Sequence, residues 1–228
     1  MPPHPVPSSY HPTPSNVYYS EDFDQRDLGE LSGQDGWQLC DDSTEGETLG
    51  HAVIENSTLA VPLHGMRCVC ITMPVDNSMY CKDMKPYFPG GIGIDRGFRA
   101  RVSVLIDSAH TGVNPTWFGS SESTNIRDNG WGAALDKTGT VFVWNGATVY
   151  TYSNLFDPFT LVDFSYTVRS DLSLQVHGSG YMGGSPVYRY PIYIGTSTPW
   201  VFNYFIIGTG DVFGQKVYYD DISVEKAG

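Results

Sequence analysis

The stretch Phe98-Arg-Ala-Arg-Val-Ser-Val-Leu-Ile106 alternates apolar and polar residues with a period of two. Its even-numbered residues are all apolar, whereas Arg99, Arg101 and Ser103 are polar. Successive side chains of a β-strand point to opposite faces, so this pattern predicts a half-buried strand. One face of that strand would cover a hydrophobic core, and the other would carry the two arginines.

Turn signals extend the β pattern along the chain. Asn145-Gly146 separates Val-Phe-Val-Trp from Ala-Thr-Val-Tyr-Thr-Tyr, and Asn-Gly between such runs strongly favours a two-residue hairpin turn. Similar signals predict roughly a dozen strands and no helix, hence an all-β fold. Alternation places these residues on inward faces: Phe98, Val102, Val104, Phe142, Trp144, Val168, Leu174, Phe205 and Val217.

Length and composition narrow the class of protein. The 228 residues suit one large β domain. A net charge of −12 argues against nucleic-acid binding, which needs Lys and Arg to neutralise phosphates. No stretch approaches the apolar length of a membrane span. The N-terminus has neither the basic start nor the apolar core of a signal peptide, so we expect synthesis in a host cytoplasm.

The four cysteines favour buried thiols over a metal site. Cys68 and Cys70 are one residue apart in a predicted strand and would share a face. Cys40 and Cys81 do not complete the two Cys-x2-4-Cys pairs that structural zinc prefers. A single disulfide is the alternative, and unpaired Cys behaves as a small hydrophobe.

The first twenty residues contain six prolines and no charged side chain. Proline favours an extended path without internal hydrogen bonds, so we expect residues 1–20 to form an arm that docks on another protein. The β-sandwich would then span residues 21–228. The expected contact residues are Pro5, Val6, Pro7, Tyr10, Pro12, Pro14, Val17, Tyr18 and Tyr19.

We expect residues 76–97 to form a second contact surface. This long irregular segment is too apolar for a disordered linker, and loops of such length are usually functional. We expect Met84, Tyr87 and Phe88 to contact the same partner.

The two ends of the chain resemble concanavalin A-like (laminin-G-like) jelly-roll domains. The similarity lies in Asp22-Phe-Asp24, Gly33-Gln-Asp-Gly-Trp37 and the closing Val217-Tyr-Tyr-Asp-Asp-Ile-Ser-Val-Glu225. It covers about residues 20–226 and implies two antiparallel sheets, with the first and last strands side by side. We therefore expect Phe23 in a strand paired with residues 218–224. This fold hosts lectins, glycosidases, lyases and interaction modules, so it does not define an activity.

Catalytic patterns are missing from the sequence. The Glu-x-Asp-x-x-Glu strand of glycosidases with this architecture does not occur among the seven glutamates. Lyases of similar fold need a His, a Tyr and basic residues on one strand face, and His110 and His177 have no such neighbours in sequence. We expect a protein that is not an enzyme.

Two ligand sites are consistent with the composition. Trp117, Trp131 and Trp144 could stack on sugars, although a two-sheet domain also uses large aromatics in its core. A calcium ion would need hard oxygen ligands, and pairing of the terminal strands would bring together Asp22, Asp24, Asp27, Asp41, Asp42, Asp220 and Asp221. Solvated strand ends are the simpler explanation of these carboxylates, so no cofactor is expected.

The combined expectation is a structural virion protein. An uncharged arm on an acidic lectin-like body, without a secretion signal, favours a decoration (cement) protein of a tailed-bacteriophage capsid. Its partners would be the major capsid protein or other virion subunits, together with further copies of itself. A carbohydrate-binding module or lectin, or a tail or fibre component, is the alternative.

Overall fold

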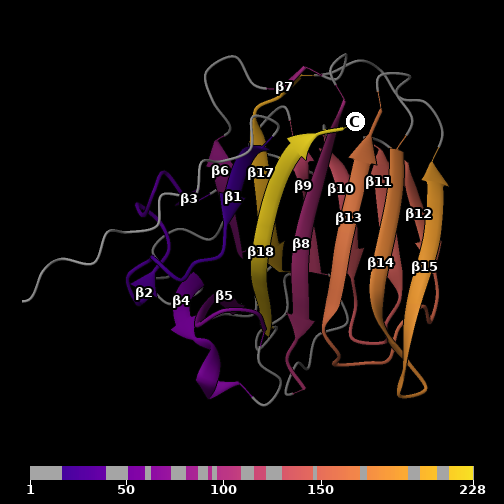
Figure 1. Ribbon diagram of the computed structural model, residues 1–228, viewed down its shortest axis with the longest axis horizontal. Coiled ribbons are helices and arrows are strands. Elements are labelled where there is room, and N and C mark those ends of the chain that lie inside the picture. Colours follow the sequence, from indigo (N-terminus) through magenta and orange to yellow (C-terminus); the bar gives the residue numbers. More distant parts are fainter. Residues whose placement is uncertain are drawn as a thin grey trace, which may run out of the picture.

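The computed structural model describes residues 17–39, 51–59, 63–72, 81–86, 92–93, 97–108, 116–121, 130–145, 148–169, 174–194, 201–209 and 216–227. Over these ranges the chain folds into two antiparallel β-sheets packed face to face, as predicted (Figure 1). The helical content of the same ranges is one 3-10 turn at Asn56–Thr58. No described helix is therefore long and apolar enough to cross a membrane.

The larger sheet has nine strands among the described residues, and it lies in front in Figure 1. Strand β1 pairs with β18 beside the main path. Along that path the order is β15 (Ser185–Ile194), β14 (Leu174–Met182), β13 (Val162–Val168), β8 (Phe98–Ile106), β18 (Lys216–Lys226), β5 (Arg67–Thr72), β4 (His51–Glu55) and β2 (Gly29–Glu30).

The smaller sheet has seven described strands and lies behind the larger one in Figure 1. A separate pair joins β16 (Val201–Phe202) to β7 (Ile92–Gly93). The order in the smaller sheet is β12 (Val149–Tyr152), β11 (Val141–Asn145), β10 (Gly130–Leu135), β9 (Thr116–Ser121), β17 (Tyr204–Thr209), β6 (Cys81–Pro86) and β3 (Gln38–Leu39).

The core fills the space between the sheets. Of the predicted core residues, six are fully or almost fully buried: Phe98, Val102, Val104, Val168, Phe205 and Val217. Aromatic rings meet edge to face at its centre, where Phe98 and Phe202 have centroids 5.2 Å apart. The side chains of Trp144 and Leu174 lie outside the described residues. Such burial supplies most of the stability of a sandwich, because apolar surface is removed from water.

Strand β11 has the opposite orientation to the predicted one. Val141 and Val143 are fully buried, whereas Phe142 is only half-buried. The prediction of an inward Phe142 is therefore wrong, and the reason is the period of two: a shift of one residue exchanges the two faces of a strand.

Strand β1 (Val17–Glu21) confirms that the terminal strands are neighbours. Its register pairs Ser20 with Ser223 and Glu21 with Ile222 on β18. Phe23 lies beyond this strand, in a turn with φ of 58°, and its ring is fully buried. The strand thus begins and ends earlier than the sequence indicated.

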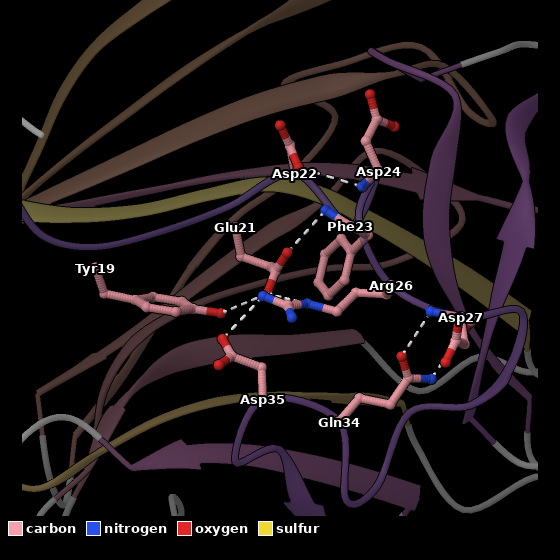
Figure 2. Close-up of polar contacts among 9 residues, drawn as sticks. All are labelled: Tyr19, Glu21, Asp22, Phe23, Asp24, Arg26, Asp27, Gln34 and Asp35. Carbon is pink, nitrogen blue, oxygen red and sulfur yellow. Dashed lines mark hydrogen bonds and ion pairs between the residues drawn. The ribbon is translucent and has the colours of Figure 1, made fainter. Parts of the chain in front are cut away.

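The carboxylate of Glu21 holds the end of β1 to the following loop (Figure 2). Glu21 Oε2 lies 2.7 Å from Arg26 Nη2, and Glu21 Oε1 accepts a 3.0 Å hydrogen bond from the Phe23 backbone N–H. Arg26 also binds Asp35 at 2.8 Å. Glu21 is almost fully buried, so these charge-assisted bonds satisfy a carboxylate that water does not reach.

The expected boundary at residue 20 falls inside β1. Val17, Tyr18 and Tyr19 are strand residues, and both tyrosine rings pack against the core. The segment expected to be an irregular loop contains β6, which pairs with β17 and β3. Met84 lies in β6, so the prediction of an irregular loop over 76–97 is wrong there.

We expect removal of residues 1–21 to destabilise the sandwich by on the order of 3 kcal/mol or more, relative to a variant that lacks residues 1–16. The longer deletion removes β1 with the packing of Tyr18 and Tyr19, and apolar burial and backbone pairing are lost together. Urea unfolding of both variants measures the difference. Equal midpoints would show that β1 contributes nothing to stability.

Candidate functional site

A groove of about 650 Å³ crosses the outer face of the larger sheet. Side chains from β1, β8, β13, β14, β15 and β18 line it, together with His64 from the turn before β5, and most of them are polar. Its volume is within the range of pockets that hold small ligands. We therefore take this groove as the candidate site.

The strand register explains why polar side chains gather here. The even-numbered residues of β8 are buried in the core, so Arg99, Arg101 and Ser103 between them face the groove. Antiparallel pairing then aligns equivalent positions of neighbouring strands into rows. One row consists of His177, Ser165, Arg101, Ser223 and Ser20. The next consists of Tyr188, Ser179, Asp163 and Ser103.

Two arginines share one carboxylate at one end of the groove. Arg101 Nη2 lies 2.9 Å from Glu225 Oε1, and Arg99 Nη1 lies 3.6 Å from the same oxygen. The Arg99 Nε–H also donates to Thr167 Oγ1 at 3.2 Å. The arginine side chains are 42% and 52% exposed, against 25% for Glu225. Two positive charges therefore meet one negative charge at a surface that water and ligands reach.

His177 and Tyr188 stand together beside this cationic end. His177 Nδ1 lies 3.0 Å from the Tyr188 hydroxyl oxygen. Burial lowers the pKa of His177, and the charges of Arg99 and Arg169 lower it further, so the imidazole is neutral at neutral pH. The sequence alone did not indicate a tyrosine or arginine near His177. The structure brings both to it through the pairing of β14 with β13 and β15.

The opposite end of the groove is acidic. Asp163 and Asp221 both approach His64, with Nε2 to oxygen distances of 3.8 and 3.9 Å. The Ser103 hydroxyl donates to Asp163 Oδ1 at 2.7 Å. Carboxylates at this end can accept hydrogen bonds from hydroxyl groups of a ligand. The groove thus has a cationic and an anionic end.

Three of the aspartates considered for calcium accept hydrogen bonds from backbone N–H groups: Asp22, Asp24 and Asp220. Asp24 Oδ1 accepts the backbone N–H groups of Met66 and Arg67 at 2.6 and 2.9 Å. Asp41 and Asp42 lie outside the described residues. Over the described ranges no group of three His, Cys, Asp or Glu side chains is arranged to hold a metal ion. The described residues therefore include no group of carboxylates that would support the calcium interpretation.

Asp220 is a fully buried carboxyl in β18, at the bulge that separates Asp220 from Ser223. Its Oδ1 accepts the Asp221 backbone N–H at 2.9 Å, while its Oδ2 has no hydrogen-bond partner among the described residues. Burial raises the pKa of Asp220 to about 8, and the nearby Asp221 and Asp24 carboxylates raise it as well. Asp220 is therefore largely protonated in the folded protein at neutral pH.

The tryptophans predicted to bind sugars do not form a described platform. Trp131 is fully buried and packs against Phe202 with ring centroids 5.6 Å apart, so it cannot stack on a ligand in solvent. Trp117 lies in β9 and Trp144 in β11, with side chains outside the described residues. The exposed aromatic ring at the groove is Tyr188, which is 54% exposed.

Most residues of the expected partner surface lie outside the described ranges. These are Pro5, Val6, Pro7, Tyr10, Pro12, Pro14, Tyr87 and Phe88, together with the side chain of Met84.

Cys68 and Cys70 are buried free thiols, as predicted for this pair. Burial raises the pKa of Cys68 well above its ordinary value, and the Asp220 carboxyl acts in the same direction. A thiol that stays protonated is a poor nucleophile and metal ligand. Cys40 and the Cys81 side chain lie outside the described residues.

Comparison with known proteins supports the fold class. Neither protein families nor curated proteins give a match to this sequence. Among solved structures, the chain is similar to the catalytic domain of a glycoside hydrolase family 131 protein from Coprinopsis cinerea (TM-score 0.59, 11% identity, 93% of this chain and 95% of that chain). It is also similar to the carbohydrate esterase vb_24B_21 of the Shiga toxin-encoding bacteriophage phi24B (TM-score 0.54, 13% identity, 93% and 99%).

A third similar structure is the binding domain of botulinum neurotoxin serotype D (TM-score 0.51, 11% identity). The alignment covers 92% of this chain and 48% of that one, so the chain spans about half of the neurotoxin domain. These likenesses show that the chain has a concanavalin A-like jelly-roll fold.

The sequence carried one usable signal for the groove. Arg99, Arg101 and Ser103 are the polar half of the alternation in β8, and Gln175-Val-His177 repeats such a pattern in β14. Placing both strands in one sheet, on either side of β13, would have joined these residues. Tyr188 gives no comparable signal, because its position depends on the register of β15.

We expect Asp220→Asn to stabilise the protein increasingly as the pH rises. The pKa of Asp220 is raised from 3.8 to about 8 on folding. The unfolded chain therefore loses this proton first, and stability falls between about pH 4 and pH 8. Melting temperatures of both proteins at several pH values measure the effect. The gain should be smallest near pH 4 and largest near pH 8, and a pH-independent difference would contradict this assignment.

Proposed function

We propose that this domain binds a glycan in the groove on the outer face of its larger sheet, without chemical turnover. The observation that carries the proposal is the alignment of hydroxyl, imidazole, guanidinium and carboxylate side chains across six strands, beside the exposed ring of Tyr188. Sugars present many hydroxyl groups and apolar ring faces. They therefore suit a site with several polar groups and an aromatic surface.

The groove also provides donors and acceptors in fixed positions. Ser103 is held by Asp163, and His177 is held by Tyr188. Residues on paired strands lose little freedom when a ligand binds, which favours affinity. Two of the similar structures are described as a glycoside hydrolase and a carbohydrate esterase. At 11–13% identity these neighbours support the fold alone.

The absence of catalysis is part of the proposal. It rests on the sequence, which lacks the glycosidase strand pattern. The His, Tyr and basic residues that lyases of similar fold need do meet at His177, so product analysis on acidic glycans tests this part of the proposal. In addition, Glu21 lines the groove, but its carboxylate is buried and already bound by Arg26 and the Phe23 N–H.

Glycan binding is tested by a glycan array followed by calorimetry on the best ligands, with Tyr188→Ala as the diagnostic variant. Loss of a central aromatic contact costs on the order of 2 kcal/mol, so we expect at least about a tenfold weaker affinity. Tyr181→Ala is the matched control, since Tyr181 is 45% exposed but does not line the groove. Absence of binding to every glycan class would reject the proposal.

A virion role is the second candidate. The proline-rich, uncharged composition of the N-terminus favours it. In this proposal residues 1–16 dock the acidic domain, with further copies of itself, on the major capsid protein or on tail or fibre subunits.

The test of the virion role compares two proteins, the full-length chain and a variant that lacks residues 1–16. Each is mixed with purified virus particles from which this protein is missing, and its attachment is measured. Both retain β1. We expect the truncated protein to remain in the supernatant after sedimentation of the particles. Equal attachment of two proteins with equal melting temperatures would contradict docking through the N-terminus.

A further inference from the structure

The groove has an uneven distribution of charge. The chain carries 25 Asp and Glu against 13 Lys and Arg. Yet Arg99 and Arg101 occupy consecutive outward positions of β8, and Arg169 follows β13 at the same end, where it donates to Gln175 at 3.3 Å. Such a cationic surface on an acidic protein would attract a negatively charged ligand to this end of the groove.

We propose that the groove binds an acidic glycan, with the carboxylate or sulfate group of the sugar at Arg99 and Arg101. This inference rests on the proposed glycan function. Each guanidinium has five N–H donors in a planar arrangement that matches a carboxylate or sulfate. The contacts to Glu225 and Thr167 leave part of this capacity for a ligand, and both side chains are about half exposed.

Glu225 contacts both arginines without neutralising them. Its Oε1 is the common acceptor, 2.9 Å from Arg101 and 3.6 Å from Arg99. One carboxylate between two guanidinium groups leaves one net positive charge, and Arg169 adds another at the same end. This excess of positive charge favours an acidic sugar there.

The neighbouring pair supports the same placement. His177 lies in the same row as Arg101, two strands away, with Ser165 between them. Its neutral imidazole can hydrogen-bond a sugar hydroxyl without adding charge. The exposed ring of Tyr188 is tilted by 48° against the imidazole and offers an apolar surface for a sugar ring.

The acidic end sets the orientation of the ligand. Asp163 and Asp221 are half exposed there, and carboxylates accept hydrogen bonds from neutral sugar hydroxyls but repel a second anionic group. The ligand class that satisfies both ends carries its acidic unit at the arginines and a neutral unit at the aspartates.

The test is calorimetry with a panel of oligosaccharides that each carry one glucuronic or galacturonic acid unit on a neutral chain. Their carboxyl-reduced counterparts and monosulfated neutral counterparts complete the panel and separate the two anionic groups. A hydrogen bond to a charged group is worth enough for about a tenfold change in affinity. We expect at least this loss when the carboxylate is reduced, unless sulfate is the recognised group, in which case the monosulfated members bind best.

Variants locate the effect. Arg101→Gln should lose about tenfold in affinity for acidic members and little for neutral ones, whereas Arg101→Lys should retain part of the preference. Glu225→Gln removes the competing carboxylate and should tighten acidic binding. As a control, Lys137→Gln removes a positive charge from the turn between β10 and β11 in the other sheet. It should change the affinity for neither the acidic nor the neutral members. If Arg101→Gln unfolds, the acid preference is still tested by comparing the affinities of the unmodified protein for the acidic and the carboxyl-reduced ligands.

The outcomes separate this inference from the proposed function. Equal affinity for acidic and neutral members, weakened together by Tyr188→Ala, would overturn the acid preference and leave glycan binding standing. No binding to any member by folded protein would overturn both. Cleavage of an acidic member would support the ligand class while contradicting the absence of catalysis.

Discussion

The structure depends on β18 being paired along both of its edges. One edge pairs with β8 over almost the whole strand. The other edge is shared: β5 pairs with Lys216–Tyr219, and β1 pairs with Ile222–Glu225. The exchange of partners coincides with the bulge after Asp220, where Asp221 has φ of 48°. Asp is among the residues that tolerate this conformation, so the side chains at the bulge suit its geometry.

The groove is a product of this arrangement. The strands that surround β18 and β8 must place apolar side chains inward, and the period of two then leaves the alternate side chains outside in continuous rows. The glycines of β14 also contribute, because they leave room for a core ring beneath the strand. Cβ atoms at Gly178 and Gly180 would lie 2.7 and 2.9 Å from the Phe156 ring. Their absence lets that ring pack under the strand that carries His177 on its other face.

Much of this fold could be predicted because it follows from local patterns. The alternation in β8 predicted both its buried face and its polar face. The resemblance of the two chain ends to concanavalin A-like domains predicted that the first and last strands lie side by side. Other features depend on tertiary contacts that no local pattern encodes. Phe23 leaves the strand because the Glu21 carboxylate binds its backbone N–H. In β11 the apolar residues Val141, Phe142 and Val143 are contiguous, so alternation could not decide which of them faces inward.

The candidate site was less accessible to sequence reasoning for a similar reason. His177 and Tyr188 meet only through the pairing of β14 with β15, whose register shifts between Val176 and Gly178. Trp117, Trp131 and Trp144 could have bound a sugar or filled the core, and the structure uses Trp131 in the core, where its large ring fills volume. Residue type alone does not distinguish these uses; the face of the strand does.

The position of β1 also bears on how the chain is made. Val17 pairs with Glu225, so β1 leaves the ribosome long before its partner strand β18. Until then its backbone groups and the rings of Tyr18 and Tyr19 lack their native neighbours. Contacts between such distant residues form late and slowly, and unpaired strand edges can join other chains in the meantime. Completion of this sandwich therefore waits for the synthesis of β18, and until then β1 is open to capture by other molecules in the cell.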